Sequence, residues 1–186
     1  MVAERERYQV ELAGKHRSLP IFEVAPGVRI AVFNLLGDTE IVSACAEGLL
    51  AKLAAIEYDL FVTPEAKSIP LAHELSRRSG KGYVVLRKVY KSYMGDTVSA
   101  ETVSITTGEP QQLFLDEKDR ARVAQSRVVL VDDVVSTGST LEGMRQVMGQ
   151  AGATIVAEAA VFTEGDPERW TEIVALGHLP VFVEGD

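Results

Sequence analysis

One thirteen-residue segment, residues 128–140 of the 186-residue chain, constrains the fold more than any other. It has the sequence Val-Val-Leu-Val-Asp-Asp-Val-Val-Ser-Thr-Gly-Ser-Thr. Four successive apolar residues are typical of a strand that is buried on both faces. Two carboxylates follow at the end of this strand, and a hydroxyl-rich turn around Gly138 then opens a helix. The segment therefore predicts a buried strand, a polar turn and a helix in direct succession, which is the unit of an α/β fold.

Short apolar strands and amphipathic helices alternate along most of the chain. We expect strands at 60–63, 83–86, 128–131 and 155–162, and helices at 69–79 and 139–151. An earlier helix is expected from an N-cap at Asp38 to about residue 55. This alternation indicates an α/β fold with a parallel twisted sheet covered by helices on both faces. Sheets of this kind bind ligands at the carboxyl ends of their strands.

Two segments depart from this alternation. Residues 1–36 contain turn signals at 13–14 and 26–27, and they predict a small antiparallel β unit with strands at 8–12, 21–24 and 28–33. Residues 90–110 are polar, with six Ser or Thr between positions 97 and 107. Such a segment predicts a functional loop or mobile β-hairpin, and the alternative is a hairpin that merely packs on a sheet edge. With no internal repeat or linker, residues 1–186 are expected to form a single domain.

Composition excludes several functions. The formal net charge of −8 argues against binding to nucleic acid or to an anionic membrane, because both attract positive charge. No apolar run approaches the ~18 residues of a membrane-spanning helix, and the charged N-terminus does not resemble a signal peptide. The single cysteine, Cys45, cannot form an intramolecular disulfide, which favours a cytoplasmic location.

The residue types at 128–140 point to a sugar phosphate. The exposed amides and dipole at a helix N-terminus bind phosphate, and Gly138 lets the backbone approach it closely. The hydroxyls at 136, 137, 139 and 140 can donate further hydrogen bonds. Asp132 and Asp133 would repel a phosphate, so we expect them to bind hydroxyls or a metal. The alternative is a carboxylate pair that caps the next helix, but the complete order of thirteen residues favours the sugar phosphate.

A cationic stretch accompanies this segment. Residues 77–91 hold six basic residues and no acidic one, whereas residues 164–186 hold six acidic residues and one Arg. The basic residues at 77, 78 and 81 lie around a helix end, where the dipole and solvent explain them. Arg87, Lys88 and Lys91 follow a strand at the edge where ligands bind, so a pyrophosphate-binding role is favoured over a solvated face. The net charge therefore does not exclude a small, multiply charged ligand.

Three segments resemble known motifs of one enzyme family. Segment 128–140 resembles the phosphoribosyl pyrophosphate (PRPP) signature of type I phosphoribosyltransferases. Residues 63–72 are similar to the family's pyrophosphate loop, and their Glu-Ala-Lys-Ser resembles the Glu-Ala-Arg-Gly of the adenine enzymes. Residues 84–92 resemble the Arg-Lys-x-x-Lys strand end of the adenine and xanthine enzymes. The resemblance covers about residues 20–165.

The resemblance implies a type I phosphoribosyltransferase fold, with residues 1–36 as a hood and residues 90–110 as a flexible catalytic loop. It implies transfer of ribose 5-phosphate from PRPP to a purine base with Mg²⁺, in a homodimer. Composition adds that no nucleic acid and no membrane are expected as partners. The implied catalytic residues are Asp132, Asp133, Lys88 and Lys91. The implied base-binding residues are Val32, Phe33 and Asn34. The implied PRPP-binding residues are Glu65, Ala66, Lys67, Ser68, Arg87, Lys88, Lys91, Asp132, Asp133, Val134, Ser136, Thr137, Gly138, Ser139 and Thr140. No residue is expected to bind Mg²⁺ directly, although Asp132 and Asp133 are candidates through water.

Three departures bear on the base and on activity. Ser136 stands where the hypoxanthine-guanine enzymes carry an Asp, so it favours adenine. Thr106 stands where the adenine enzymes carry a loop Glu, which the xanthine enzymes also lack. Lys67 replaces an Arg and cannot make the bidentate phosphate contact of Arg. We therefore predict an adenine enzyme, with a xanthine or other 6-oxopurine enzyme, or a catalytically silent PRPP-binding regulator, as alternatives. A Rossmann nucleotide-binding module is disfavoured because no Gly-x-Gly-x-x-Gly follows a strand.

Overall fold

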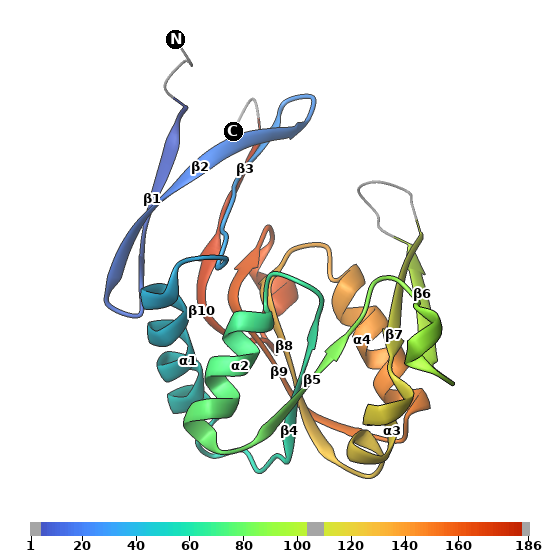
Figure 1. Ribbon diagram of the computed structural model, residues 1–186. Helices are drawn as coiled ribbons and strands as arrows, with labels where there is room; N and C mark the ends of the chain where they lie inside the picture. The colour runs from blue at the N-terminus through green and yellow to red at the C-terminus, as the bar shows by residue number, and fades with distance from the viewer. Residues whose placement is uncertain (1–4, 104–109, 184–186) are drawn as a thin grey trace.

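A five-stranded parallel sheet forms the centre of the protein (Figure 1). The computed structural model describes residues 5–103 and 110–183. The strands lie in the order β10-β9-β8-β4-β5, and every neighbouring pair is parallel. Their bounds are β4 (Leu60–Pro64), β5 (Gly82–Leu86), β8 (Arg127–Val135), β9 (Thr154–Glu164) and β10 (Val174–Leu179). The expected α/β fold with a parallel sheet is thus confirmed.

Helices cover both faces of this sheet because each face carries its own apolar cluster. On one face, α1 (Thr39–Leu53) and α2 (Ile69–Ser79) pack against alternate residues of the central strands, such as Val129 and Val131. On the other face, α4 (Ser139–Gln150) and α3 (Glu117–Val123) pack against Val128 and Leu130. These four strand residues are fully buried, as the uninterrupted apolar run predicts.

Local sequence signals explain the helix ends. Asp38 accepts a hydrogen bond from the backbone N–H of Ile41 and so caps α1 as expected. Helix α2 has the predicted bounds and ends at Gly80 in the left-handed conformation, with φ of 71°. Strand β8 is longer than predicted: it continues to Val135, so the two carboxylates lie within the strand, close to its end. Pairing with β9 along this length explains the extension.

A second sheet stands beyond the carboxyl edge of the parallel sheet (Figure 1). Its first strands are the antiparallel β1 (Arg7–Leu12), β2 (Lys15–Ala25) and β3 (Val28–Ala31). The fourth strand, β11 (Val181–Val183), pairs with β3 from the other end of the chain. Neither β10 nor β11 was predicted. Strand β10 pairs with β9 and strand β11 pairs with β3, so the acidic C-terminal segment contributes one strand to each sheet.

The polar segment 90–110 leads into a β-hairpin that extends beyond it to Leu115. It begins with a short helix, η1 (Ser92–Met94), and continues as β6 (Val98–Val103) and β7 (Pro110–Leu115). The hairpin packs on α4, where a Cβ added at Gly143 would lie 3.1 Å from Leu113 Cδ1. The tip of the hairpin, where the resemblance predicts mobility, lies outside the described residues, and so does Thr106.

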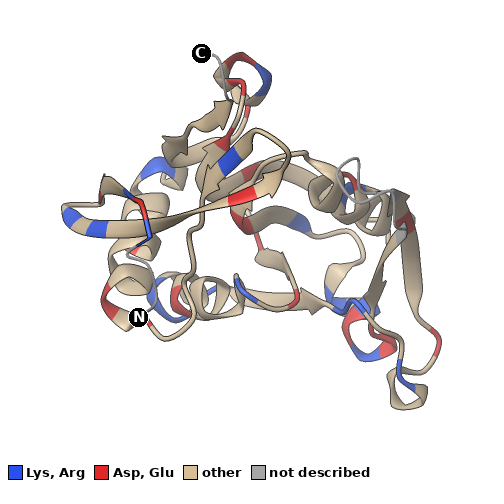
Figure 2. Ribbon diagram, turned by 90° about the horizontal axis from the view of Figure 1, so that it is seen from above, with Lys and Arg blue, Asp and Glu red and all other residues tan. Residues whose placement is uncertain are grey.

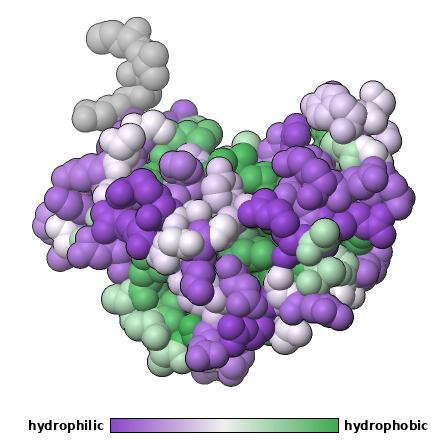
Figure 3. Space-filling view, turned by 60° about the horizontal axis from the view of Figure 1, so that its bottom comes forward, coloured by the Kyte–Doolittle hydropathy of each residue, from purple (hydrophilic) through white to green (hydrophobic). Residues whose placement is uncertain are grey.

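The surface carries both signs of charge. Seen from above the carboxyl edge, acidic and basic segments are interspersed over the described ribbon (Figure 2). Hydrophilic residues also cover much of the face that Figure 3 brings forward, with smaller hydrophobic areas between them. None of the described helices is long and apolar enough to cross a membrane.

Candidate active site

The strand order creates a crevice between β4 and β8. The chain leaves β4 toward α2 on one face of the sheet and leaves β8 toward α4 on the other face. The connections therefore diverge at the carboxyl ends of these two neighbouring strands. Open α/β sheets bind their ligands at such a topological switch point. The segments at 65–68 and 132–140, predicted to bind one ligand, begin at this crevice.

The carboxylate pair lies in this crevice. Asp132 and Asp133 are only 8% and 9% exposed. Asp132 Oδ1 accepts hydrogen bonds from the backbone N–H of Asp133 at 2.8 Å and from Ser68 Oγ at 3.3 Å. Burial, together with the neighbouring carboxylate of Asp133, raises the pKa of Asp132. A buried carboxyl group with a raised pKa, such as that of Asp132, is a candidate for a functional site.

The end of β4 is also joined to the end of β5. Glu65 Oε2 accepts hydrogen bonds from the backbone N–H of Lys88 at 3.0 Å and from Arg87 Nε at 3.2 Å. The N–H of Lys88, and after it the guanidinium of Arg87, lower the pKa of Glu65. Glu65 is therefore an ionised anchor that holds segment 87–88 beside the loop after β4.

The predicted cations differ in their pairing. Arg87 forms an ion pair with Glu65, so its charge is partly neutralised. Lys67, Lys88 and Lys91 are exposed, and within the described ranges 5–103 and 110–183 no carboxylate forms an ion pair with any of them. These three lysines are therefore available to an anion that binds across the ends of β4 and β5.

The turn after β8, residues 136–140, leads into the N-terminus of α4, and we call it the phosphate loop after its predicted role. Gly138 adopts φ of 82°, a left-handed conformation that favours glycine, and it caps the 12-residue helix α4. The hydroxyls of Thr137 and Ser139 lie 3.0 Å apart. The loop encloses a small cavity of about 30 Å³, lined by Asp132, Val134, Val135, Ser136, Thr137, Gly138, Thr140 and Leu141. A small polar cavity at a helix N-terminus is suited to a phosphate group.

The predicted base-binding residues form the connection between the N-terminal sheet and α1. The ring of Phe33 is 4% exposed and packs edge-on against Phe162, with the ring centroids 4.9 Å apart. Asn34 Oδ1 accepts a hydrogen bond from the N–H of Leu36 at 3.0 Å, and Val32 N–H bonds to the carbonyl of Pro20. In the ligand-free protein Phe33 is thus a core residue, and Val32 and Asn34 are the more exposed members of this segment.

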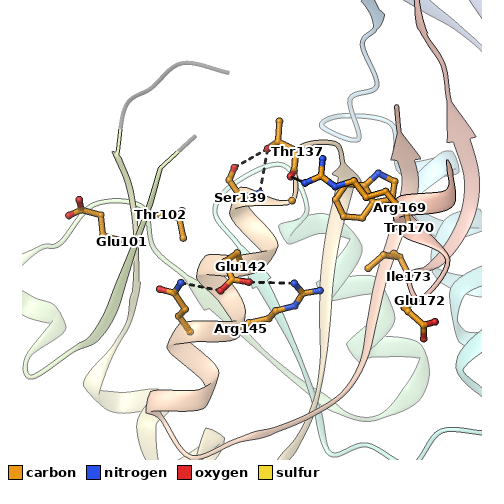
Figure 4. A pocket seen from close by; sticks show the side chains of 12 residues that line it. Glu101, Thr102, Thr137, Ser139, Glu142, Arg145, Arg169, Trp170, Glu172 and Ile173 are labelled. Atoms are coloured by element: carbon orange, nitrogen blue, oxygen red, sulfur yellow. Dashed lines mark hydrogen bonds and ion pairs between the residues drawn. The ribbon is translucent and has the colours of Figure 1, made fainter. Parts of the chain in front are cut away.

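Sequence reasoning missed three residues beside the phosphate loop. Glu164 lies at the carboxyl end of β9, is 9% exposed, and has its pKa raised by burial. Trp170 and Arg169 belong to the short helix η2 (Pro167–Trp170) and reach the back of the phosphate loop (Figure 4). No periodicity or motif marks these residues, because only the packing of η2 against the end of β9 and the phosphate loop brings them to the site.

Comparison with known proteins agrees with this geometry. The family model of the phosphoribosyl transferase domain matches residues 38–175, which include segments 63–72, 84–92 and 128–140. The chain belongs to the phosphoribosyltransferase family. The predicted family is thereby confirmed.

Relatives of this phosphoribosyltransferase have several activities. An adenine phosphoribosyltransferase of Thermosipho africanus is 29% identical over 76% of the chain and 80% of the relative. A hypoxanthine/guanine phosphoribosyltransferase of Methanococcus voltae is 35% identical over 78% of the chain and 71% of the relative. The purine biosynthesis transcriptional repressor PurR of Bacillus subtilis is 28% identical over 90% of the chain but 58% of its own length. The crystal structure of the Thermoanaerobacter pseudethanolicus adenine phosphoribosyltransferase superposes with a TM-score of 0.65 at 24% identity, covering 77% of this chain and 84% of that one.

Proposed function

We propose that this protein is a purine phosphoribosyltransferase that converts PRPP and a free purine base to the nucleoside 5′-monophosphate and pyrophosphate, with adenine as the favoured base. One observation carries the proposal. The contact between Ser68 and Asp132 brings the loop that resembles a pyrophosphate loop against the strand that leads into the phosphate loop. A ligand with a phosphate, hydroxyls and a pyrophosphate in series has matching partners along this crevice.

Each part of PRPP would bind a different part of the crevice. The 5-phosphate would bind the phosphate loop, and the ribose hydroxyls would bind Asp132 and Asp133. The pyrophosphate would lie toward Lys67, Lys88 and Lys91. During the reaction the C1–O bond of ribose breaks and its electron pair leaves with pyrophosphate, while a ring nitrogen of the base forms a bond to C1 and loses its proton to solvent. Fixed cations stabilise the charge that develops on the leaving group. Because the base itself is the nucleophile, no nucleophilic side chain is needed.

The donor set fits Mg²⁺ that enters with the substrate. The described residues contain no cluster of three or more His, Cys, Asp or Glu side chains that could hold a metal by themselves. Mg²⁺ often combines one or two carboxylates with water and substrate phosphates, which suits the buried pair Asp132 and Asp133. These two residues would hold Mg²⁺ through water. When bound, the ion would neutralise charge on the pyrophosphate.

The base is the least constrained part of the proposal. Ser136 and the Thermosipho relative support adenine, whereas the 35% identical hypoxanthine/guanine relative supports a 6-oxopurine. The similarity to the Bacillus repressor supports the third candidate, a PRPP-binding regulator without turnover, together with the departures at Lys67 and Thr106.

We also propose a cytoplasmic homodimer. The family resemblance supports it, and so do the exposed apolar side chains of Val89, Tyr90 and Tyr93, which follow one another closely in the chain beside β5. Analytical ultracentrifugation of the wild type and of a Tyr93→Ser variant tests the dimer. A monomeric wild type at micromolar concentration would contradict it.

The deciding experiment measures pyrophosphate release with PRPP, Mg²⁺ and each of adenine, xanthine, hypoxanthine, guanine, uracil and orotate. We expect the fastest release with adenine, and a 6-oxopurine in its place would establish the second candidate. No release with any base, alongside tight PRPP binding by calorimetry, would establish the regulator. Absence of PRPP binding would overturn the proposal. The double variant Asp132→Asn with Asp133→Asn is expected to lose both binding and turnover.

A further inference from the structure

A groove of about 610 Å³ lies behind the phosphate loop (Figure 4). Its floor is α4, one wall is strand β6 of the hairpin, and the opposite wall is η2 with the residues that follow it. Its head is formed by Thr137, Gly138 and Ser139. The phosphate loop thus separates this groove from the small cavity, and side chains that line the groove can act on the loop without touching a phosphate in the cavity.

Trp170 packs directly on the turn of the phosphate loop. A Cβ added at Gly138 would lie 2.8 Å from Trp170 Cη2, so the edge of the indole ring lies against the Cα of Gly138. The indole Nε1–H donates a hydrogen bond of 2.9 Å to the carbonyl of Glu164 at the end of β9. The ring is therefore fixed to the sheet at one end and supports the left-handed residue of the loop at the other.

Arg169 holds the peptide that precedes this residue. Arg169 Nη2 donates a hydrogen bond of 3.1 Å to the carbonyl oxygen of Thr137, and its guanidinium lies 4.8 Å from the centroid of the Trp170 ring. The peptide bond between Thr137 and Gly138 is trans, so its N–H points opposite to its C=O. By holding this carbonyl on the groove side, Arg169 turns the N–H of Gly138 away from the groove. The carbonyl is thereby also kept away from a bound anion, which it would repel.

We propose that Arg169 and Trp170 are positioning residues that set the phosphate loop in its anion-binding conformation. They act through the backbone of Thr137 and Gly138 and do not touch the ligand. The proposal rests on the proposed function only for the identity of the ligand as PRPP. The positioning role itself holds for any anion that binds at the N-terminus of α4.

The first experiment compares four variants of the full chain. Arg169→Leu removes the donor, and Arg169→Lys retains a cation that can donate one hydrogen bond. Trp170→Phe retains an aromatic ring but removes the hydrogen bond to Glu164. Glu172→Gln is the control, because this exposed side chain lines the same groove without contacting the loop. The measurements are the Kd of PRPP with Mg²⁺ by calorimetry, the KM of each substrate, kcat, and Tm.

We expect Arg169→Leu to raise the Kd and KM of PRPP about 10- to 150-fold, the range for loss of a hydrogen bond to a charged group. Arg169→Lys should recover part of this loss, and Trp170→Phe should show a smaller increase. In these three variants the KM of the base and the Tm should stay close to the wild-type values. In Glu172→Gln every measured value should stay close to the wild type. An unchanged Kd of PRPP in Arg169→Leu, or an equal rise in the KM of both substrates with a lowered Tm, would overturn the proposal in favour of general packing.

The second experiment uses the fluorescence of Trp170, the single tryptophan of the sequence. Because its ring lies against Gly138, an anion that binds the loop should change its emission. Inorganic phosphate and PRPP are titrated separately into the wild type and Arg169→Leu. We expect saturable changes in the wild type and weaker binding in the variant. If phosphate binds with this behaviour but PRPP does not, the proposed function fails and the positioning role stands. Binding of either ligand by calorimetry without a change in emission, or no binding of either, would overturn the positioning role.

Discussion

The hairpin and α4 meet at Gly143, and this contact predicts different outcomes for two similar substitutions in one helix. In a helix interior, Ala is more favourable than Gly by about 0.5–1 kcal/mol. At Gly149 an added Cβ would meet no atom within 4 Å, so Gly149→Ala should show this gain. At Gly143 the Cβ would lie 3.1 Å from Leu113 Cδ1 and 3.2 Å from Thr102 Cγ2, closer than the about 3.5–4.0 Å at which carbon atoms attract.

The hairpin must therefore move by a few tenths of an ångström in Gly143→Ala. Overpacking of this kind typically destabilises by about 1–3 kcal/mol. After the gain in helix propensity, we expect a net destabilisation of about 0–2 kcal/mol for Gly143→Ala. For a chain of this size each kcal/mol shifts Tm by about 2–4 °C. We expect Tm to rise by about 1–4 °C in Gly149→Ala and to stay unchanged or fall by up to about 8 °C in Gly143→Ala.

Thermal unfolding followed by circular dichroism measures both shifts, and steady-state kinetics with PRPP and adenine completes the test. Because the hairpin carries the proposed catalytic loop, Gly143→Ala should also lower kcat several-fold, whereas Gly149→Ala should not. If Gly143→Ala gained as much stability as Gly149→Ala, the hairpin would not pack on α4 as described. If Gly143→Ala retained the wild-type kcat, the position of the hairpin would have no influence on turnover.

Three further predictions concern the site. Burial and Asp133 raise the pKa of Asp132, so ionisation of Asp132 destabilises the folded protein as the pH rises above its unfolded-state pKa of about 3.9. Ligand-free Asp132→Asn should therefore have a higher Tm than the wild type at pH 8 but not at pH 4, while losing PRPP binding; an equal difference at both pH values would contradict this. Phe33→Ala should lower stability by about 3 kcal/mol, and Tm by about 6–12 °C, because its buried ring packs on Phe162; a Tm change below 2 °C would show that the ring is not packed. Glu65→Ala should raise the KM of PRPP about 10-fold by releasing Arg87 and the backbone of Lys88; a rise confined to the KM of the base would refute that role.

The elements that sequence reasoning predicted well are those whose signals are local. Helix α2 begins and ends at the predicted residues, because Pro70 in its first turn and Gly80 directly after its last residue are local signals. The four apolar residues before Asp132 are fully buried, as their uninterrupted run requires. The phosphate loop is a candidate from sequence for the same reason: its glycine, hydroxyls and carboxylates are consecutive, so no distant contact is needed to assemble it.

Elements that depend on distant partners were missed. Strand β11 has three residues, and its pairing with β3, about 150 positions earlier in the chain, establishes it as a strand. The pairing of Arg87 with Glu65, 22 residues away, was also not predicted, and the role of Arg87 toward pyrophosphate stays a prediction. The packing of the Phe33 ring on Phe162 was likewise not predicted, and the role of this segment toward the base stays a prediction. In each case a side chain or strand has several possible partners, and the packing of the whole chain selects one.

The sequence alone therefore determined the class of the fold and the motifs of the family, because apolar spacing and consecutive polar residues act over one or two turns of the chain. The tertiary structure decided how the site is assembled. It placed β4 beside β8, so that Ser68 meets Asp132, and it brought Arg169 and Trp170 to the back of the phosphate loop. Strand order and the path of a connecting segment depend on burying both apolar faces of the parallel sheet at once. Only the folded chain satisfies this requirement.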